Sequence, residues 1–424
     1  MLLSKSFDCK GLWWLPNEKV ARGGILTYSP TKGIYLEVFG SLNESGFNRS
    51  QLLKEFQTIE GNSHQYQSIT LIGCLCLGVK ISTNTTLQIE RYKCKGIIIG
   101  SHHYSIDLDT PLFNSVTISS PHLTAWMDST KEPVRKLLDE GFSYEEGIIQ
   151  TCTLADNMQV SFQKCYIRHA DQIKFQITPQ VQLTLSSNHG ICLNQIYYYI
   201  ERFADLLSLI CLGTPAIETI HIKEKDESSN IHIAHYLPDR LPYAKSVKKL
   251  PYLLFHYKDL QKYGLSLQEL LDQWFNIDKD IEPIREHLIN SINLRSQFST
   301  IDFQTITYAL EGFYHRFRGH NDKREKLKDR IKALKDEFEN IECISLANIN
   351  PKAIADTRNY YSHFYFRPND IIYEGVELID QTLILRKLLM CCVLRLIGFT
   401  YEAINIIMKQ NIDLRITANQ AIDE

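Results

Sequence analysis

An arginine and a histidine stand five residues apart near the C-terminal end of the chain, in the run DTRNYYSH at residues 356–363. Arg358 is a permanent cation whose planar donor fork fits a phosphate group. His363 can take and give a proton near neutral pH. RNA cleavage without a metal needs a base for the 2′-hydroxyl, an acid for the leaving 5′-oxygen and positive charge for the phosphorane. The two residues are therefore candidates for that chemistry.

The spacing alone favours an ordinary surface arginine and a histidine that either caps a helix or is buried with its hydrogen bonds made, because such pairs occur by chance in a long chain. Local features favour a site. Asn359 follows the arginine and can orient a phosphate, and Tyr360 and Tyr361 can stack on bases. The segment also lies between a charged amphipathic helix and a long apolar helix, where a helical bundle can hold a surface site.

The geometry of a helix limits how Arg358 and His363 can meet. Five residues correspond to about 140° around an ideal α-helix, so the two side chains diverge on a regular one. They converge only if Arg358 lies in the first turn or if two subunits share the site. A two-fold dimer would bring two arginines and two histidines to one phosphate. We therefore expect a homodimer or a higher homo-oligomer.

Several segments resemble the ApeA family, and the resemblance covers nearly the whole chain. The run TRNYYSH (357–363) resembles the R-N-x3-H form of the HEPN ribonuclease motif, and TYALEGFYHR (307–316) resembles the first helix of ApeA-like HEPN domains. The segments GLWWLP (11–16), GILTY (24–28) and LEVFG (36–40) are similar to the β-rich domain that precedes HEPN in this family.

This resemblance implies a bacterial anti-phage effector that acts by abortive infection and is held inactive until infection. It further implies metal-independent RNA cleavage that leaves a 2′,3′-cyclic phosphate. Carried over by position, Arg358 stabilises the phosphorane, His363 is the acid and base, and Asn359 assists. Glu311 in the earlier helix is expected to orient Arg358 or His363, although an exposed helix glutamate is nearly as good an interpretation.

Other candidate groups have weaker support. His315, Arg316, Arg318 and His320 cluster at a helix end, where they either contact RNA phosphates or complement the helix dipole; the spacing favours the dipole slightly. The adjacent histidines His102 and His103 resemble half of a metal site. No Asp, Glu or Cys stands at a recognisable spacing from them, so a turn is the better interpretation. We expect no metal and no cofactor.

Composition sets the class of protein. Hydrophobic residues make up 44% of the chain and charged residues 22%, and the net charge is −3. A nucleic-acid site must therefore be a local patch.

The 11 cysteines are scattered and odd in number, which indicates reduced thiols in a cytosolic protein. The N-terminus lacks a signal-peptide pattern. The apolar segment 376–399 contains charged residues, so it predicts a buried helix and no membrane span.

The first part of the chain reads as β-structure. Short apolar runs, in which buried-type and polar residues alternate, are separated by turn residues. This pattern predicts an antiparallel sandwich. The expected strands are 24–28, 34–38, 69–79, 86–90, 96–100, 115–119, 159–162, 181–185, 218–223, 230–236 and 252–257. A helix is expected at 194–211.

From about residue 265 the pattern is helical. The expected helices are 266–275, 281–298, 300–317, 322–342, 351–366, 370–396 and 400–408. The helix at 322–342 carries seven Lys/Arg and seven Asp/Glu around one apolar seam. We therefore predict an α+β protein: a β-sandwich-like, ApeA-like sensor domain at 1–258, followed by an all-α HEPN bundle at 259–424.

Two functional hypotheses follow, with a third behind them. In the first, the chain is a cytoplasmic endoribonuclease that cuts RNA, with transfer RNA as one candidate, when a phage-encoded protein triggers it. In the alternative, the helices only dimerise and the β-domain binds a phage protein or a carbohydrate. The third is a toxin silenced by nucleotidyl transfer to Tyr360 or Tyr361, which the long N-terminal domain disfavours.

Overall fold

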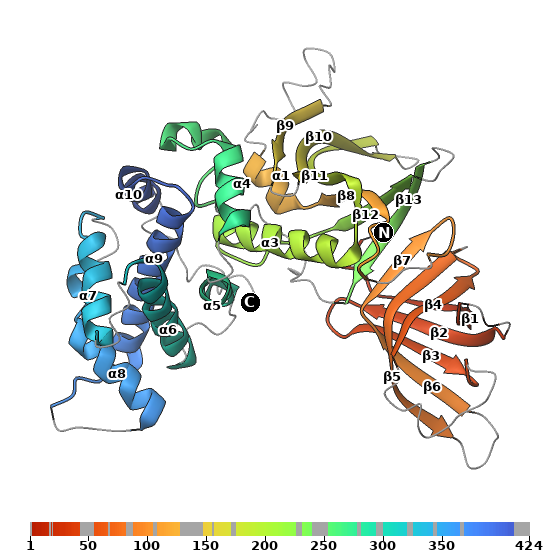
Figure 1. The fold of residues 1–424 in the computed structure, drawn as a ribbon, viewed down its shortest axis with the longest axis horizontal. Helices are drawn as coiled ribbons and strands as arrows, with labels where there is room; N and C mark the ends of the chain where they lie inside the picture. Colours follow the sequence, from red (N-terminus) through yellow and green to blue (C-terminus); the bar gives the residue numbers. More distant parts are fainter. Residues whose placement is uncertain are drawn as a thin grey trace. The chain divides into compact units, whose positions relative to one another are not determined.

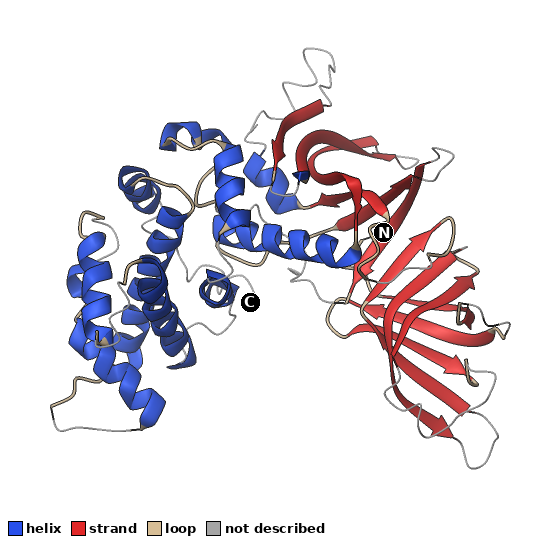
Figure 2. Ribbon diagram, viewed as in Figure 1, coloured by secondary structure: helices blue, strands red, loops and turns tan. Residues whose placement is uncertain are grey.

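The chain forms two compact units in the computed structural model. The structure describes residues 2–16, 18, 20–42, 55–66, 68–81, 88–104, 108–127, 147–154, 157–170, 175–225, 231–239, 253–277, 281–293, 300–319, 325–341, 346–364 and 369–410. The β-rich unit comprises residues 1–204 and 215–250, and the helical unit comprises 205–214 and 251–424. Strands dominate one unit and helices the other (Figure 2), which confirms the predicted α+β class. The predicted domain limits, 1–258 and 259–424, stay a prediction.

Six strands of the β-rich unit close into an antiparallel barrel. They run β1 (Phe7–Trp14), β2 (Arg22–Ser29), β3 (Gly33–Phe39), β4 (Glu55–Ser63), β5 (Ser68–Ile81) and β6 (Gln88–Cys94). Their order is β4-β1-β2-β3-β6-β5, and β4 also pairs with β5, which closes the ring (Figure 1). Alternate residues point inward as the sequence pattern requires. Leu26 faces Leu36 across the β2–β3 pair, and both are fully buried.

The long strand β5 joins the barrel to a second sheet. Its first half, 68–72, pairs with β7 (Gly96–Gly100), and its second half, 75–81, pairs with β6. Gly73 lies between the two halves with φ +57°, and a Cβ there would come within 2.6 Å of the Lys95 side chain. Glycine alone takes this backbone conformation at no steric cost. This residue therefore lets one strand serve both sheets.

The second sheet continues from β7. Its order is β7-β13-β12-β8-β11-β10-β9, with all pairs antiparallel. The remaining elements of this unit are β8 (Phe113–Ser119), α1 (Pro121–Met127), β9 (Gly147–Thr153), β10 (Gln159–Ala170), β11 (Phe175–Ile191), α3 (Leu193–Cys211, whose last turns belong to the helical unit), β12 (Thr219–Lys225) and β13 (Ile231–Pro238). The β-rich domain is thus a barrel continued by a sheet, where the sequence predicted a sandwich. Alternation defines an inner face but does not say which strands pair.

A buried histidine makes the stability of the β-rich unit depend on pH. His122 accepts a hydrogen bond from the Ala216 backbone N–H at Nδ1 (3.1 Å), and burial lowers the pKa of His122 to about 4. The rings of His221 and His235 lie 4.7 Å apart, and burial lowers the pKa of both, that of His235 to about 4.

We expect the free energy of unfolding of this unit to decrease as the pH falls from about 6.5 to about 4. In that window the unfolded chain protonates its histidines near their ordinary pKa of about 6.5, while the folded chain keeps His122 and His235 neutral, so the unfolded state binds more protons. The lowered pKa of His221 acts in the same direction. His122 alone should contribute on the order of 3 kcal/mol across the window. Urea denaturation at pH 7 and pH 4.5 measures the change. His122→Asn, whose amide oxygen can accept the same hydrogen bond, should reduce it; an unaltered pH dependence would contradict the assignment.

The helical unit is built from seven α-helices in the described residues. They are α4 (Leu267–Asn276), α5 (Glu282–Asn293), α6 (Thr300–Phe317), α7 (Leu327–Glu337), α8 (Pro351–His363), α9 (Gly375–Leu396) and α10 (Tyr401–Gln410). Short 3-10 turns lie at η3 (Tyr257–Asp259), η4 (Gln261–Tyr263) and η7 (Leu346–Asn348). The predicted serine cap is present: Ser266 and Glu269 form a reciprocal capping box at the start of α4. Within the described parts of the chain, no helix has the length and hydropathy to cross a membrane.

A fully buried ion pair ties α5, α6 and α9 together. Arg386 Nη2 lies 2.5 Å from Asp302 Oδ2, and both side chains have no exposed surface. The hydroxyl of Ser291 donates to Asp302 Oδ1 (2.6 Å) and accepts from Arg386 Nε (2.8 Å). This network explains why an apolar helix contains an arginine, since the charge is compensated inside the core.

Asp302→Ala should destabilise the helical unit by about 3–5 kcal/mol, because it leaves the Arg386 guanidinium buried without its counter-ion. Guanidinium chloride denaturation followed by circular dichroism at helical wavelengths measures this loss. The double variant Asp302→Leu/Arg386→Met removes both charges and should recover most of the stability. If the free energy of unfolding of Asp302→Ala lay within about 1 kcal/mol of the wild-type value, the ion pair would contribute little to stability.

One predicted strand is wrong and several helix limits differ. Residues 253–257 of the expected strand 252–257 contain no strand. Leu254 and Phe255 are buried instead, and the Phe255 ring lies 5.1 Å from that of Phe399. A short aromatic run suits a strand or a packed connection equally well, and contact with the helices decided the outcome. The helices expected at 322–342 and 370–396 begin later, at Leu327 and Gly375. The predicted loose tail after residue 410 and His320 lie outside the described residues.

Ten of the eleven cysteines lie in the described residues, and all ten are free thiols, nine of them buried. Burial of this kind agrees with the prediction of thiols that act as small apolar side chains.

Candidate functional site

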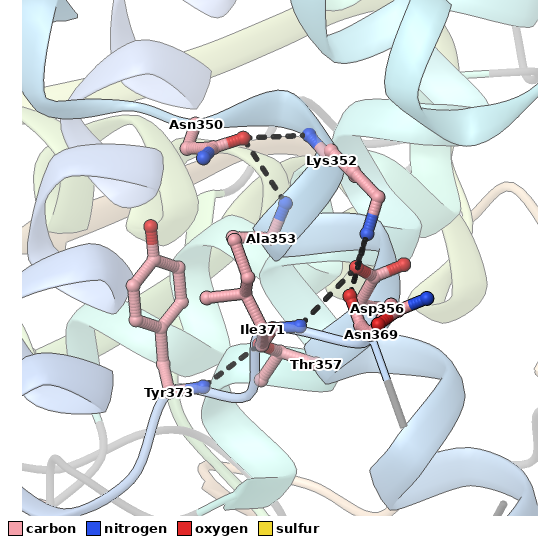
Figure 3. Close-up of polar contacts among 8 residues, drawn as sticks. All are labelled: Asn350, Lys352, Ala353, Asp356, Thr357, Asn369, Ile371 and Tyr373. Carbon is pink, nitrogen blue, oxygen red and sulfur yellow. Dashed lines mark hydrogen bonds and ion pairs between the residues drawn. The ribbon is translucent and has the colours of Figure 1, made fainter. Parts of the chain in front are cut away.

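Helix α8 carries the Arg358/His363 motif, and its start is defined by the sequence. Asn350 precedes the helix, and its side-chain oxygen accepts hydrogen bonds from the N–H groups of Lys352 (3.1 Å) and Ala353 (3.2 Å), as Figure 3 shows. Pro351 occupies the first turn, where its missing N–H costs nothing. The cap and the proline together fix where the helix begins.

The segment 369–373 runs along α8 and is bonded to its central turns (Figure 3). The N–H of Tyr373 donates to Thr357 Oγ1 (3.0 Å), and the N–H of Ile371 donates to Asp356 Oδ2 (3.4 Å). The ammonium of Lys352 contacts both Asp356 Oδ2 (2.5 Å) and the carbonyl of Asn369 (3.3 Å). These bonds hold the backbone directly before Arg358.

Glu311 joins the motif arginine to a second arginine. Its carboxylate lies between Arg358 Nη2 on α8 (3.2 Å) and Arg330 Nη1 on α7 (3.1 Å). The three side chains are 17% (Arg358), 27% (Glu311) and 12% (Arg330) exposed, so they interact in a partly desolvated environment. The structure thus brings Glu311 and Arg358 together, and the orienting role of Glu311 stays a prediction.

Tyr308 and Ser362 connect the C-terminal turn of α8 to α6. The hydroxyls of the two residues lie 2.7 Å apart, and Gln304 Nε2 donates to Ser362 Oγ (3.4 Å). The Arg358 guanidinium carbon lies 5.7 Å from the centre of the Tyr308 ring, a cation–π distance. Sequence reasoning missed both residues, since a tyrosine on an exposed helix face and a lone serine carry no recognisable signal.

His363 is the last residue of α8 and is exposed. Phe364 follows in a left-handed conformation with φ 55° and is 83% exposed. Arg358 lies in the middle of this regular helix and faces Glu311, so the first-turn condition for convergence with His363 is not met. Asn359 is exposed beside it. On one helix, the five-residue separation places the two candidate catalytic groups about 140° apart.

The candidate RNA-binding residues differ in their surroundings. Tyr361 donates to the carbonyl of Tyr373 (3.3 Å), and its ring packs edge-on against that of Tyr360 at 5.1 Å. Arg318 makes two hydrogen bonds to Glu337 (2.9 and 3.0 Å), which raise the pKa of Arg318 and bind it to α7. Arg316, in contrast, is exposed.

A cavity opens beside the Glu311 ion pairs. It has a volume of about 350 Å³ and lies within the helical unit. The lining side chains come from α5, α6 and α7 and include His287, Tyr308, Glu311, His315, Arg316 and Arg330. Sequence reasoning missed His287 and Arg330. Arg330 is one of seven cations in the charged segment 322–342, and periodicity alone does not separate it from the others.

The described residues hold no cluster of three or more His, Cys, Asp or Glu side chains suited to a metal ion. His102 lies in a bend, in agreement with the turn interpretation, and its Nε2 contacts Glu224 at 3.1 Å.

The fold and the motif define a class of protein: a β-rich N-terminal domain joined to a helical HEPN domain that carries R-N-x3-H on one helix. Residues 8–274 match the family described as ApeA N-terminal domain 1, and residues 216–403 match the family described as Apea-like HEPN. The chain therefore belongs to the ApeA-like HEPN family, as the sequence resemblance indicated. No curated protein and no solved structure matches the chain.

Proposed function

We propose that this chain is a metal-independent endoribonuclease of anti-phage defence, with a site shared between two copies. Family membership supports the general class. The observation that carries the reaction is the α8 motif, in which Arg358 is oriented by Glu311 (3.2 Å) and His363 is exposed at the helix end. These groups supply a fixed cation and a titratable acid–base.

The reaction follows from the chemistry of the two groups. One His363 takes the proton of the 2′-hydroxyl, and the 2′-oxygen attacks the adjacent phosphorus. Arg358 stabilises the charge of the phosphorane, with Asn359 as a further donor. The bond to the 5′-oxygen breaks, and the second His363 of the dimer gives that oxygen a proton. The products are a 2′,3′-cyclic phosphate and a 5′-hydroxyl end, and no water is consumed.

Two copies are required because Arg358 and His363 diverge on a single α8. A two-fold axis beside the helix would bring the His363 of one copy toward the Arg358 of the other. The β-rich unit serves as the sensor in this proposal. A phage protein that binds it would shift the enzyme from a resting to an active state, because an effector acts through its differential affinity for the two states.

The test is RNA cleavage by the purified wild-type chain in EDTA, followed by sequencing and end-group analysis of the products. The proposal expects cuts in cellular RNA, transfer RNA included, that leave cyclic phosphate ends. Products with 5′-phosphate ends would overturn the proposal. It would also be overturned if phage infection arrests the growth of cells that produce the chain, but the purified chain cuts no RNA when lysate of that phage is added.

The alternative is a HEPN module that only dimerises, with a β-domain that binds a phage protein or a carbohydrate. The contact between Arg358 and Glu311 fits this alternative as well, since a purely structural ion pair would look the same. Inducible expression in bacteria separates the two. Growth arrest that is lost in the Arg358→Ala/His363→Ala double variant supports the nuclease, and arrest that persists supports sequestration of a partner.

A further inference from the structure

Three side chains of α6 form a stripe that faces the motif helix. Gln304, Tyr308 and Glu311 follow one another at spacings of four and three residues, which places them on one face of α6. Arg358 and Ser362 are four residues apart and share one face of α8 in the same way. Glu311 contacts Arg358 (3.2 Å), and Gln304 donates a hydrogen bond to Ser362 (3.4 Å). The two stripes therefore lie against each other.

Tyr308 contacts both residues of the α8 stripe. The centre of its ring lies 5.7 Å from the Arg358 guanidinium carbon, and its hydroxyl oxygen lies 2.7 Å from that of Ser362. Tyr308 is 44% exposed, so it makes these contacts at the surface of the helical unit. One side chain thus joins the motif arginine to the turn of α8 that ends at His363.

Both candidate catalytic groups need support of this kind. An arginine side chain has many rotamers, and a single ion pair leaves part of that freedom. The Tyr308 ring gives the Arg358 guanidinium a second contact, which restricts the rotamers further. His363 is the last residue of α8, and helix ends tend to fray because their final carbonyls have no partner within the helix. The bond between Tyr308 and Ser362 holds that last turn to α6.

We propose that Tyr308 is a positioning residue for RNA cleavage, an inference that rests on the proposed nuclease function. Its ring holds the Arg358 guanidinium, and its hydroxyl holds the final turn of α8, which carries His363. In this role Tyr308 touches no reacting atom and acts only through the two groups that do. Placement matters for the rate, because a displacement of about 1 Å in an active site can lower it by about 10²-fold.

Two substitutions separate the ring from the hydroxyl. Tyr308→Phe loses only the bond to Ser362 and should lower the single-turnover rate constant by roughly 2- to 10-fold, the usual effect of one hydrogen bond. Tyr308→Leu also loses the ring and should lower it by roughly 10- to 100-fold. Affinity for a 2′-O-methyl RNA should stay at the wild-type value, since positioning acts on the transition state. A loss of folded protein alone would lower the amplitude of cleavage and leave the rate constant unchanged.

Matched variants test whether the effect belongs to this contact. Tyr314 lies on the same helix, but its hydroxyl donates to Glu325 (3.0 Å), so Tyr314→Phe should cleave at the wild-type rate. Ser362→Ala removes the Tyr308 bond from the other side and should lower the rate constant at least as much as Tyr308→Phe. The double variant should be no slower than Ser362→Ala, because both changes break the same interaction.

Hydrogen–deuterium exchange gives a readout that does not depend on cleavage. In the full chain, the backbone amides of residues 360–364 should exchange roughly 2- to 10-fold faster in Tyr308→Phe than in the wild type, and Tyr314→Phe should leave them unchanged. Unchanged exchange in Tyr308→Phe would overturn the proposal, because the hydroxyl would then not hold the turn.

Failure of this inference is distinguishable from failure of the nuclease proposal. If the wild type cuts RNA and Tyr308→Leu cuts it with the same rate constant, the positioning role is overturned and the nuclease stands. If the wild type cuts no RNA, the nuclease is rejected, and the role of Tyr308 in cleavage is rejected with it.

Discussion

His363→Ala should lower RNA cleavage by about 10²–10⁴-fold, because the variant has no group to move the protons of the 2′-hydroxyl and the leaving 5′-oxygen. His363 is exposed at the end of α8, so its removal should leave the fold intact. Cleavage of a labelled transfer RNA in EDTA measures the loss, and thermal denaturation checks that the variant is folded.

His189 offers a matched control. It is also exposed, and it lies in the β-rich unit away from the motif helix in the sequence. His189→Ala should cleave RNA at the wild-type rate. If His363→Ala and His189→Ala both kept full activity, His363 would have no catalytic role and the nuclease proposal would lose its acid–base.

Arg358→Ala should lower cleavage by about 10²–10³-fold, the usual effect of removing one donor that stabilises transition-state charge. Stability should change by only about 1 kcal/mol, since the lost ion pair is partly exposed and Glu311 keeps Arg330 at 3.1 Å. Arg358→Lys keeps the charge but loses the planar donor fork, so its cleavage rate should lie between the rates of the wild type and of Arg358→Ala. The rate is measured under single-turnover conditions.

A mixture of the two inactive variants tests the shared site. A dimer of one Arg358→Ala chain and one His363→Ala chain still presents one arginine and one histidine at the common phosphate. Co-purified mixed dimers should therefore recover part of the lost activity, whereas a site confined to one chain would recover none. Equal activity of Arg358→Ala and wild type would remove the arginine from the mechanism altogether.

Elements with strong local patterns were predictable from the sequence. The capped start of α4 at Ser266 and the limits of α6, Thr300–Phe317, agree with the prediction, because capping residues and helical periodicity act locally. Barrel closure was not predictable, since the pairing of β4 with β5 depends on which strand faces are complementary in space. The packed connection at Leu254 was mistaken for a strand for the same reason.

The candidate site shows the same division. Arg358 and His363 stand in one short motif, and Glu311 entered through the resemblance of its helix. Arg330, Tyr308 and Ser362 come from other turns or helices, and they meet the motif only because α6, α7 and α8 pack together. The spacing of residues along the chain does not predict contacts between different helices, and each of these residues alone is an ordinary helix-surface residue.

Closure of the six-stranded barrel has a consequence for solubility. A terminal strand exposes unpaired backbone groups on which another chain can build, and this is a common start of aggregation. Because β4 pairs with both β1 and β5, the described sheet order terminates at a single open strand, β9. β9 has only seven residues and carries an isoleucine, Ile148, that is 67% exposed. Among the described strands, edge-to-edge association can therefore begin at this one short strand, where a lysine in place of Ile148 would be a natural safeguard.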